Sequence, residues 1–109
     1  MFKIAKYPDS ILRKTAREIP QGDFNDDLKK MADDMAKVMY EDDGIGLAAP
    51  QVSHSIRLIV IGLGHGEYKT YANPEITFFS KEKTTTDEGC LSLPKIFGNV
   101  VRPKKIHIK

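Results

Sequence analysis

The stretch GIGLAAPQ, residues 44–51, stands where a helical pattern ends and a strand pattern begins. Its first six residues fit G-x-G-x-x-A, a form of the dinucleotide-binding fingerprint, which has a mechanism only where it follows a strand and opens a helix. Here a helical pattern precedes it, and Pro50 leads into a strand. This order argues against a nucleotide-binding fold and favours an α+β protein.

An amphipathic helix of about four turns is predicted before this stretch, with Asn25 as N-cap and an end before Gly44. Five apolar residues recur at the spacing of one helix face: Leu28, Met31, Met35, Val38 and Met39. Methionines at such spacing more often belong to a core than to an adaptable binding face, so we assign them to the core. A shorter helix is predicted to start at residues 8–10, before the break at residues 20–22.

After the glycine-rich stretch the pattern becomes that of strands. Residues 56–61 predict a buried strand, residues 62–66 a turn and residues 67–72 a returning strand. Further strands are indicated at residues 76–79, 84–86, 100–101 and 106–108. The predicted class is α+β, with mostly antiparallel sheets packed around helix in a single domain over residues 1–109.

Composition excludes several classes of protein. The chain has 109 residues, 40% of them hydrophobic and 29% charged, with a formal net charge of +2. This balance does not fit a disordered chain, and no apolar run reaches the roughly 18 residues of a membrane span. The single cysteine excludes an internal disulfide. The first residues do not resemble a secretory signal.

Charge is unevenly distributed along the chain. Residues 23–43 hold eight acids and three lysines, whereas residues 95–109 hold five basic residues and no acid. A basic end suggests contact with nucleic acid or the ribosome. The alternative is a solvated strand edge that lysines keep soluble, and we favour it because no aromatic residues are interleaved and no basic helix face is present.

The glycine-rich stretch itself has two interpretations. Glycines let a backbone lie close against a ligand, and Gln51 ends the stretch with an amide that both donates and accepts hydrogen bonds. The alternative is a glycine-capped helix end followed by an ordinary loop.

A second unusual stretch, EGCLSLP, occupies residues 88–94. A lone cysteine is most often a small buried hydrophobe, but Gly89 leaves room beside Cys90 and Glu88 places a carboxylate next to it. Such a thiolate is a candidate nucleophile or metal ligand. The three histidines, His54, His65 and His107, do not stand at i, i+4 spacing, so sequence spacing alone gives Cys90 no partner.

Together the two stretches resemble the peptide deformylase family, whose members carry G-x-G-x-A-A-x-Q and then E-G-C-x-S. Residues 7–13, 72–76 and 100–103 resemble the family's N-terminal turn, its N-P-x-I segment and its V-x-R-P segment. The resemblance covers essentially the whole chain and implies a peptide-deformylase-like fold. It also implies metal-dependent removal of the formyl group from the N-terminal formyl-methionine of new proteins.

The resemblance implies roles for individual residues. Cys90 would be one ligand of a mononuclear metal, typically Fe²⁺, held with two histidines and a water; Zn²⁺, Ni²⁺ or Co²⁺ would suit the same ligands. The Gln51 side-chain amide and the Leu91 backbone N–H would form the oxyanion hole.

The substrate side of the site follows from the same resemblance. Gly44, Ile45 and Gly46 would line the peptide and methionine pocket, with Glu88 and Gly89 beside them. We further expect Glu88 to hold its loop through an ion pair with Arg102.

One family motif is not found in these 109 residues. The Q-H-E-x-D-H helix supplies both histidine ligands and the catalytic glutamate, and no such segment occurs here. We therefore expect the isolated chain to bind metal weakly and not to deformylate. We also expect reduced apolar cover for Met31, Met35, Ile59 and Ile61, and self-association or pairing with a fragment that carries the third motif.

Two alternative functions stay open. One is a non-catalytic deformylase-like protein that binds formyl-methionyl peptides, and the other is a basic-edged ribosome- or RNA-binding module. For the enzyme, the expected partners are formyl-methionyl nascent peptides and a transient ribosome contact, with no membrane and no DNA. Because the resemblance begins at Met1, we expect a bacterial cytoplasmic protein rather than an organellar one.

Overall fold

The computed structural model describes residues 2–103 and 106–108 of the chain. It contains one α-helix, α1 (Asp26–Glu41), in the part of the chain that it describes. The strands are β1 (Gly46–Ala48), β2 (Leu58–Gly64), β3 (Glu67–Ala72), β4 (Ile76–Phe79), β5 (Lys83–Cys90), β6 (Leu93–Pro103) and β7 (Ile106–Ile108). Short 3-10 turns lie at η1 (Ser10–Arg13), η2 (Gln21–Asp23) and η3 (Ala49–Val52).

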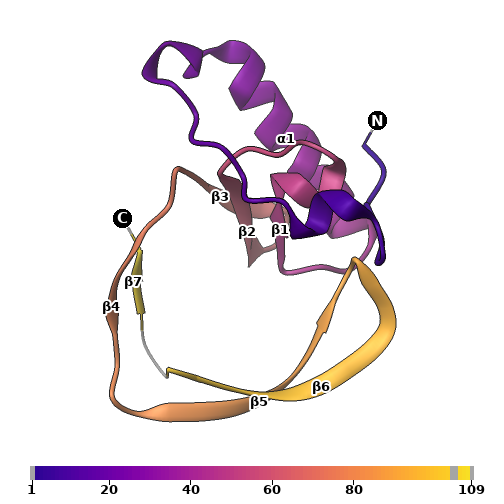
Figure 1. Ribbon diagram of the computed structural model, residues 1–109, viewed down its shortest axis with the longest axis vertical. Helices are drawn as coiled ribbons and strands as arrows, with labels where there is room; N and C mark the ends of the chain where they lie inside the picture. Colours follow the sequence, from indigo (N-terminus) through magenta and orange to yellow (C-terminus); the bar gives the residue numbers. More distant parts are fainter. Residues whose placement is uncertain (1, 104–105, 109) are drawn as a thin grey trace.

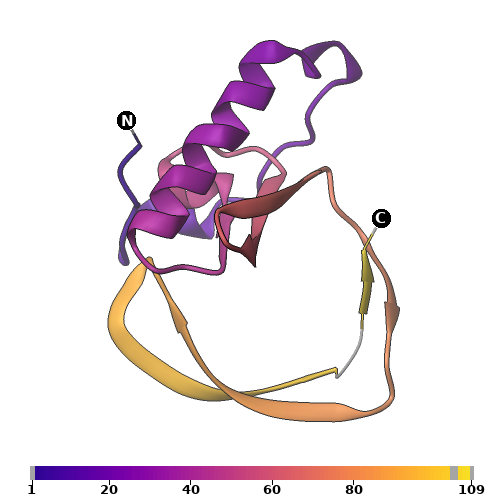
Figure 2. The ribbon, with the colours of Figure 1, turned by 180° about the vertical axis from the view of Figure 1, so that it is seen from behind.

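All of these strands pair in antiparallel fashion, as the sequence predicted. One sheet has the order β1-β2-β3, and the other strands form the pairs β4-β7 and β5-β6. In Figure 1 the helix α1 packs against the three-stranded sheet, while the β5-β6 hairpin forms a long curved ribbon on the other side. Seen from behind, α1 crosses in front of that sheet, and β4 and β7 lie side by side (Figure 2).

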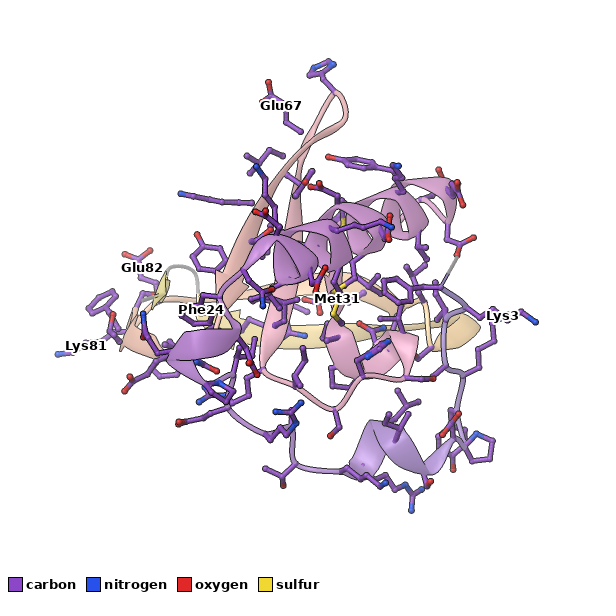
Figure 3. All side chains as sticks on the ribbon, turned by 90° about the horizontal axis from the view of Figure 1, so that it is seen from above. Lys3, Phe24, Met31, Glu67, Lys81 and Glu82 are labelled. Atoms are coloured by element: carbon purple, nitrogen blue, oxygen red, sulfur yellow. The ribbon has the colours of Figure 1, made fainter. Side chains whose placement is uncertain are left out.

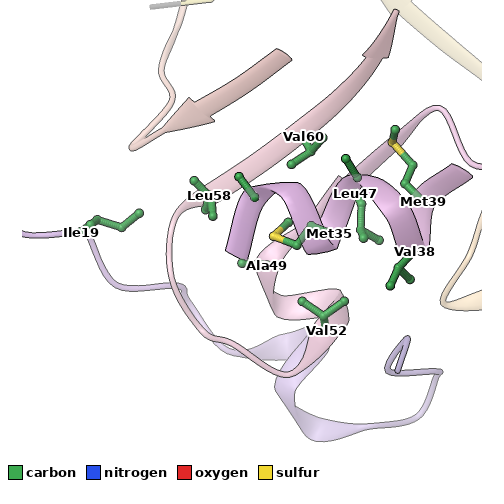
Figure 4. Packing of buried hydrophobic residues seen from close by; sticks show 11 residues of the cluster. Ile19, Met35, Val38, Met39, Leu47, Ala49, Val52, Leu58 and Val60 are labelled. Carbon is green, nitrogen blue, oxygen red and sulfur yellow. The ribbon is translucent and has the colours of Figure 1, made fainter. Parts of the chain in front are cut away.

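The core lies between α1 and the three-stranded sheet, where Met35 and Met39 meet Leu58 and Val60 (Figure 4). These four side chains are fully buried. The assignment of the helical apolar face to the core is confirmed, although Leu28 and Met31 pack at its margin and are only partly buried. The expectation that Met35 lacks apolar cover is wrong, because β2 covers it.

Both ends of α1 are fixed by local hydrogen bonds. Asn25 is the N-cap as predicted, and its side-chain oxygen accepts from the Leu28 N–H at 3.1 Å. At the other end, the Asp43 N–H donates to the Tyr40 carbonyl and the Gly44 N–H to the Met39 carbonyl, which is the Schellman pattern. The left-handed residue of this cap is Asp43, with φ of 58°. The alternative interpretation, in which a glycine caps the helix, is therefore wrong, because an aspartate takes that position.

The glycine-rich stretch is not an ordinary loop, because it contains β1. Leu47 faces the core and is 3% exposed, and it pairs in register with Val60. The predicted strand at residues 56–61 is shifted: β2 begins at Leu58, and only Leu58 and Val60 are buried, while Ile59 and Ile61 are partly exposed. Only one face of β2 therefore contacts the core.

The predicted turn at residues 62–66 is also shorter than expected. Strand β2 continues through Gly64 because Gly62 pairs with Tyr68 and Gly64 with Glu67 of β3. The Gly62 N–H also donates to the Ile45 carbonyl, and the Gly64 N–H donates to the Tyr40 hydroxyl. The turn itself consists of His65 and Gly66, both with positive φ. Figure 3 shows Glu67 near the outer tip of this hairpin.

The N-terminal segments are anchored by side chains of other elements. The predicted first helix is the single turn η1, whose cap Asp9 accepts from the Ile11 N–H. Ile19 is buried, and its backbone forms two hydrogen bonds with the Asn73 side chain. In the described residues, no helix combines the length and the apolar character that crossing a bilayer would need.

Candidate active site

The side chain of Gln51, in the turn η3, is held at both of its polar atoms. Its Oε1 accepts a hydrogen bond from the Ala48 N–H at 3.0 Å. Its Nε2 donates to the Ser92 hydroxyl at 3.1 Å and toward the Cys90 Sγ at 3.5 Å. Because the Ala48 N–H needs an acceptor, the amide is oriented with its NH₂ group toward the cysteine motif.

The cysteine motif lies where β5 turns into β6. Gly89 pairs with Phe97, but Cys90 pairs with Leu93, so the register shifts at the cysteine and leaves Leu91 and Ser92 in a tight turn. Cys90 is exposed and not disulfide-bonded, whereas Ser92 is buried at 3% exposure. The sequence argument against a buried Cys90 is therefore confirmed.

Gly44 brings the first motif against the second. A Cβ at Gly44 would lie 2.7 Å from the Leu91 Cδ1 and 3.3 Å from the Met39 Cγ. A side chain at this position would displace Leu91. Close packing against Leu91, rather than helix capping, therefore explains why a glycine occupies position 44. Gly44, Gln51 and Leu91, which sequence reasoning named together, thus lie in one region of the structure.

The neighbouring residues Ile45 and Gly46 form an open edge. Strand β1 is the outer strand of its sheet, and Ile45 just before it is 85% exposed. A Cβ at Gly46 would make only an ordinary contact, 3.7 Å from the Val60 carbonyl oxygen. In the described part of the chain, the free edge of β1 is therefore accessible to a ligand backbone.

The predicted ion pair between Glu88 and Arg102 is present. The guanidinium contacts the carboxylate through two nitrogens, with Nε donating to Oε2 at 2.6 Å and Nη2 donating to Oε1. The hydrogen bonds that Arg102 donates to Glu88, and then the negative charge of Glu88, raise the pKa of Arg102 above its ordinary value. The pair links the two strands of the hairpin that carries Gly89 and Cys90.

The described residues do not make up a metal centre. Among them, no group of three or more histidine, cysteine, aspartate or glutamate side chains is placed to hold an ion. His54 packs edge-on against Phe2, and His65 lies at the tip of the β2-β3 hairpin. The backbone of His107 is in β7, opposite Phe78. Cys90 thus supplies one thiol, and no reaction step through a metal follows from these residues.

The comparison with known families agrees with this geometry. Residues 1–109 match the model of a family described as polypeptide deformylase. The chain belongs to this family. Its fold also matches solved peptide deformylases, with a TM-score of 0.92 and 40% identity to that of Thermotoga maritima. That match covers 99% of this chain and 71% of the solved chain, and it confirms the predicted fold class.

Curated relatives include bacterial and plant deformylases. The chain is 40% identical to the peptide deformylase of Fusobacterium nucleatum over its whole length, and it covers 63% of that protein. It is 44% identical to the rice protein named peptide deformylase 1B, chloroplastic, with 98% of this chain and 40% of that protein covered. The chain thus spans less than two thirds of the length of these deformylases.

Sequence reasoning missed two residues that shape this site. Ser92 was part of the quoted motif without a role, and the structure places its hydroxyl on the Gln51 amide. The Ala48 N–H, which orients that amide, was missed because the surrounding stretch was taken as a loop. A small polar residue between Leu91 and Leu93 was the available signal for Ser92.

Proposed function

We propose that this chain carries the oxyanion and peptide-binding parts of a peptide deformylase that acts on the N-terminal formyl-methionine of nascent proteins. One observation carries the proposal. The NH₂ group of Gln51, oriented by Ala48, lies beside Cys90 at the turn that holds Leu91. The family contains hydrolases, and this amide is a fixed donor of the kind that acyl hydrolysis requires.

The proposed chemistry places charge next to that donor. When water adds to the formyl carbon, negative charge develops on the carbonyl oxygen. The C–N bond then breaks as a proton from that water passes to the methionine nitrogen, which gives formate and the free amine. The Gln51 Nε2–H and the Leu91 N–H would stabilise this charge, and one such donor contributes about 3–4 kcal/mol to lowering the barrier. Because Ala48 already holds the amide, little reorganisation is needed as the charge forms.

Peptide binding is assigned to the free edge of β1. An extended substrate backbone would add to this edge as a further strand, with Gly46 offering its backbone groups. Gly44 and Ile45 would line the side-chain pocket, with Glu88 and Gly89 as further substrate-binding residues. The Glu88–Arg102 pair supports this proposal because it links the two strands of the hairpin that carries Glu88 and Gly89.

The metal remains a proposal. A bound Fe²⁺, or Zn²⁺, Ni²⁺ or Co²⁺, would lower the pKa of a coordinated water and polarise the formyl group. Cys90 would be its thiolate ligand. The 109 residues contain no H-E-x-x-H segment, so the two histidines and the catalytic glutamate must be provided by further sequence. We therefore propose that residues 1–109 alone are inactive.

Partners and location are proposed on the same basis. We assign formyl-methionyl nascent peptides as substrate, with transient ribosome contact, in the bacterial cytoplasm. The bacterial relatives support this location, while the plant relatives show that chloroplast members are similarly close in sequence. An RNA-binding function has weaker support, because Arg102 at the basic end is paired with Glu88.

A complementation assay tests the proposed function. Residues 1–109 are mixed with a separately expressed segment of a bacterial relative that carries H-E-x-x-H, with Fe²⁺ or Ni²⁺, and formate release from a formyl-methionyl peptide is followed. We expect no turnover by the chain alone and turnover in the mixture. Gln51→Glu, which keeps the acceptor but loses the NH₂ group, should lower the rate by roughly 10²–10³-fold.

Two results would contradict the proposal: normal turnover by the chain alone, or full activity of the Gln51→Glu mixture. Binding of the formyl-methionyl peptide without turnover in any mixture would favour the non-catalytic alternative. Titration of the chain with RNA at two salt concentrations tests the remaining alternative, which requires salt-dependent binding.

A further inference from the structure

The N-terminal arm, residues 2–7, runs between the two segments that carry the candidate site. The Ala5 N–H donates to the Gln51 carbonyl, and the Tyr7 N–H donates to the Ser92 carbonyl at 2.8 Å. Gln51 and Ser92 are 41 residues apart in the sequence. One short piece of backbone therefore bonds to both motif segments.

The position of the arm does not depend on these two hydrogen bonds alone. Ala5 is 7% exposed, and Phe2 and Ile4 pack against the core cluster. The Phe2 ring also stacks edge-on against the His54 ring, with centroids 5.3 Å apart. Burial of these side chains therefore fixes the arm from which the two N–H groups project.

Main-chain and side-chain hydrogen bonds together connect the arm, Gln51 and Ser92 in a ring. The arm joins Gln51 to Ser92 through their carbonyls, and the Gln51 Nε2 joins the same residues through the Ser92 hydroxyl. If the two segments moved apart, the amide would lose Ser92, and its approach to Cys90 at 3.5 Å would change with it.

We infer that the N-terminal arm is a positioning element, in which the Ala5 and Tyr7 N–H groups set the spacing between Gln51 and Ser92. The arm thereby sets how far the Gln51 amide, which Ala48 orients, lies from Ser92 and Cys90. This inference rests on the proposed function for the role of that amide in catalysis. The geometry can be measured without any turnover.

Amide hydrogen exchange in the chain Met1–Lys109 gives the first test, because it needs no substitution. We expect the Ala5 and Tyr7 amides to exchange at least tenfold more slowly than the Lys6 amide, because both donate hydrogen bonds, whereas none of the hydrogen bonds found among the described residues has the Lys6 N–H as donor. Equal exchange rates for the three amides would overturn the inference.

The second test removes one N–H by Ala5→Pro and follows the NMR cross-peak between the Gln51 side-chain amide and the Ser92 β protons. We expect this cross-peak to fall at least twofold. It should stay unchanged in Lys6→Pro, which alters the same arm, and in Leu58→Val, which weakens the core elsewhere. A folded Ala5→Pro chain with the full cross-peak would overturn the inference.

An ester in place of the Ile4–Ala5 amide removes the same N–H without a proline ring. This variant replaces Ala5→Pro in the test if the Ala5→Pro chain does not fold. The same twofold loss is expected, and an unchanged cross-peak would overturn the inference. The two proposals can fail separately. A Gln51→Glu mixture that keeps full activity removes the proposed function, whereas the exchange rates and the cross-peak decide the role of the arm.

Discussion

The side-chain amide nitrogen of Gln51 lies 3.1 Å from the buried hydroxyl of Ser92. This contact joins the turn after β1 to the turn between β5 and β6, so it holds the two family motifs together. Among the residues whose side-chain burial the structure describes, Ser92 is the one buried polar residue, and Gln51 is its side-chain partner. The Ser92 hydroxyl gives the Gln51 amide a hydrogen-bond acceptor at this position.

Ser92→Ala should lower the free energy of unfolding by about 1–2 kcal/mol, because the Gln51 amide then loses a partner in a buried site. Ser10→Ala, at an exposed position in η1, should change it by less than about 0.5 kcal/mol. Urea unfolding of both variants measures the difference. Equal stabilities would show that the hydroxyl contributes nothing to the fold.

Gly44→Ala should destabilise the chain by about 1–2 kcal/mol, because the new Cβ would lie 2.7 Å from the Leu91 Cδ1 and 3.3 Å from the Cγ of the fully buried Met39. Gly46→Ala is the matched control two residues along, where the nearest atom would be 3.7 Å away. Its effect should be within about 0.5 kcal/mol. Thermal unfolding compares the two, and a Gly46→Ala variant as unstable as Gly44→Ala would contradict the packing explanation.

Asn73→Ala should lower the free energy of unfolding by about 2–3 kcal/mol. The asparagine forms two hydrogen bonds with the Ile19 backbone, at 2.7 and 3.0 Å, and has a positive φ of 51°. Asn73→Gly loses the same hydrogen bonds but tolerates this φ, so it should be more stable than Asn73→Ala by about 1 kcal/mol. Urea unfolding checks the order, and the reverse order would be inconsistent with a left-handed residue at this position.

The Glu88–Arg102 pair makes a prediction about pH. The pKa of Arg102 is raised in the folded chain. The ion pair therefore contributes fully to the stability of the fold below the ordinary arginine pKa, and this contribution is lost only as pH rises through the raised pKa. The difference in Tm between the parent chain and Arg102→Gln should therefore be the same at pH 7 and pH 10. It should shrink in 1 M salt, since the guanidinium is exposed. A difference that disappears by pH 10 would contradict this assignment.

The helix was largely predictable, because its signals are local. The side chain of Asn25 and the apolar spacing from Leu28 to Met39 lie within one segment, and both were confirmed. The boundaries of β2 were not predictable, because Gly62 and Gly64 bond to Ile45 and Tyr40 of other segments. The local sequence predicts a turn at these glycines, but in the structure they belong to β2 and bond to residues that are distant in the sequence.

The sequence by itself determined the family and the α+β class, and it indicated Gly44, Gln51, Cys90 and Leu91 as candidate site residues, since motif spacing and periodicity are properties of the chain alone. Only the tertiary structure decided that Gln51 points its NH₂ group at Cys90 and Ser92, and that the arm reaches both segments. The physical reason is that a hydrogen bond between residues 41 positions apart depends on how α1, the sheet and the hairpin pack together. No local pattern in a sequence records that distance.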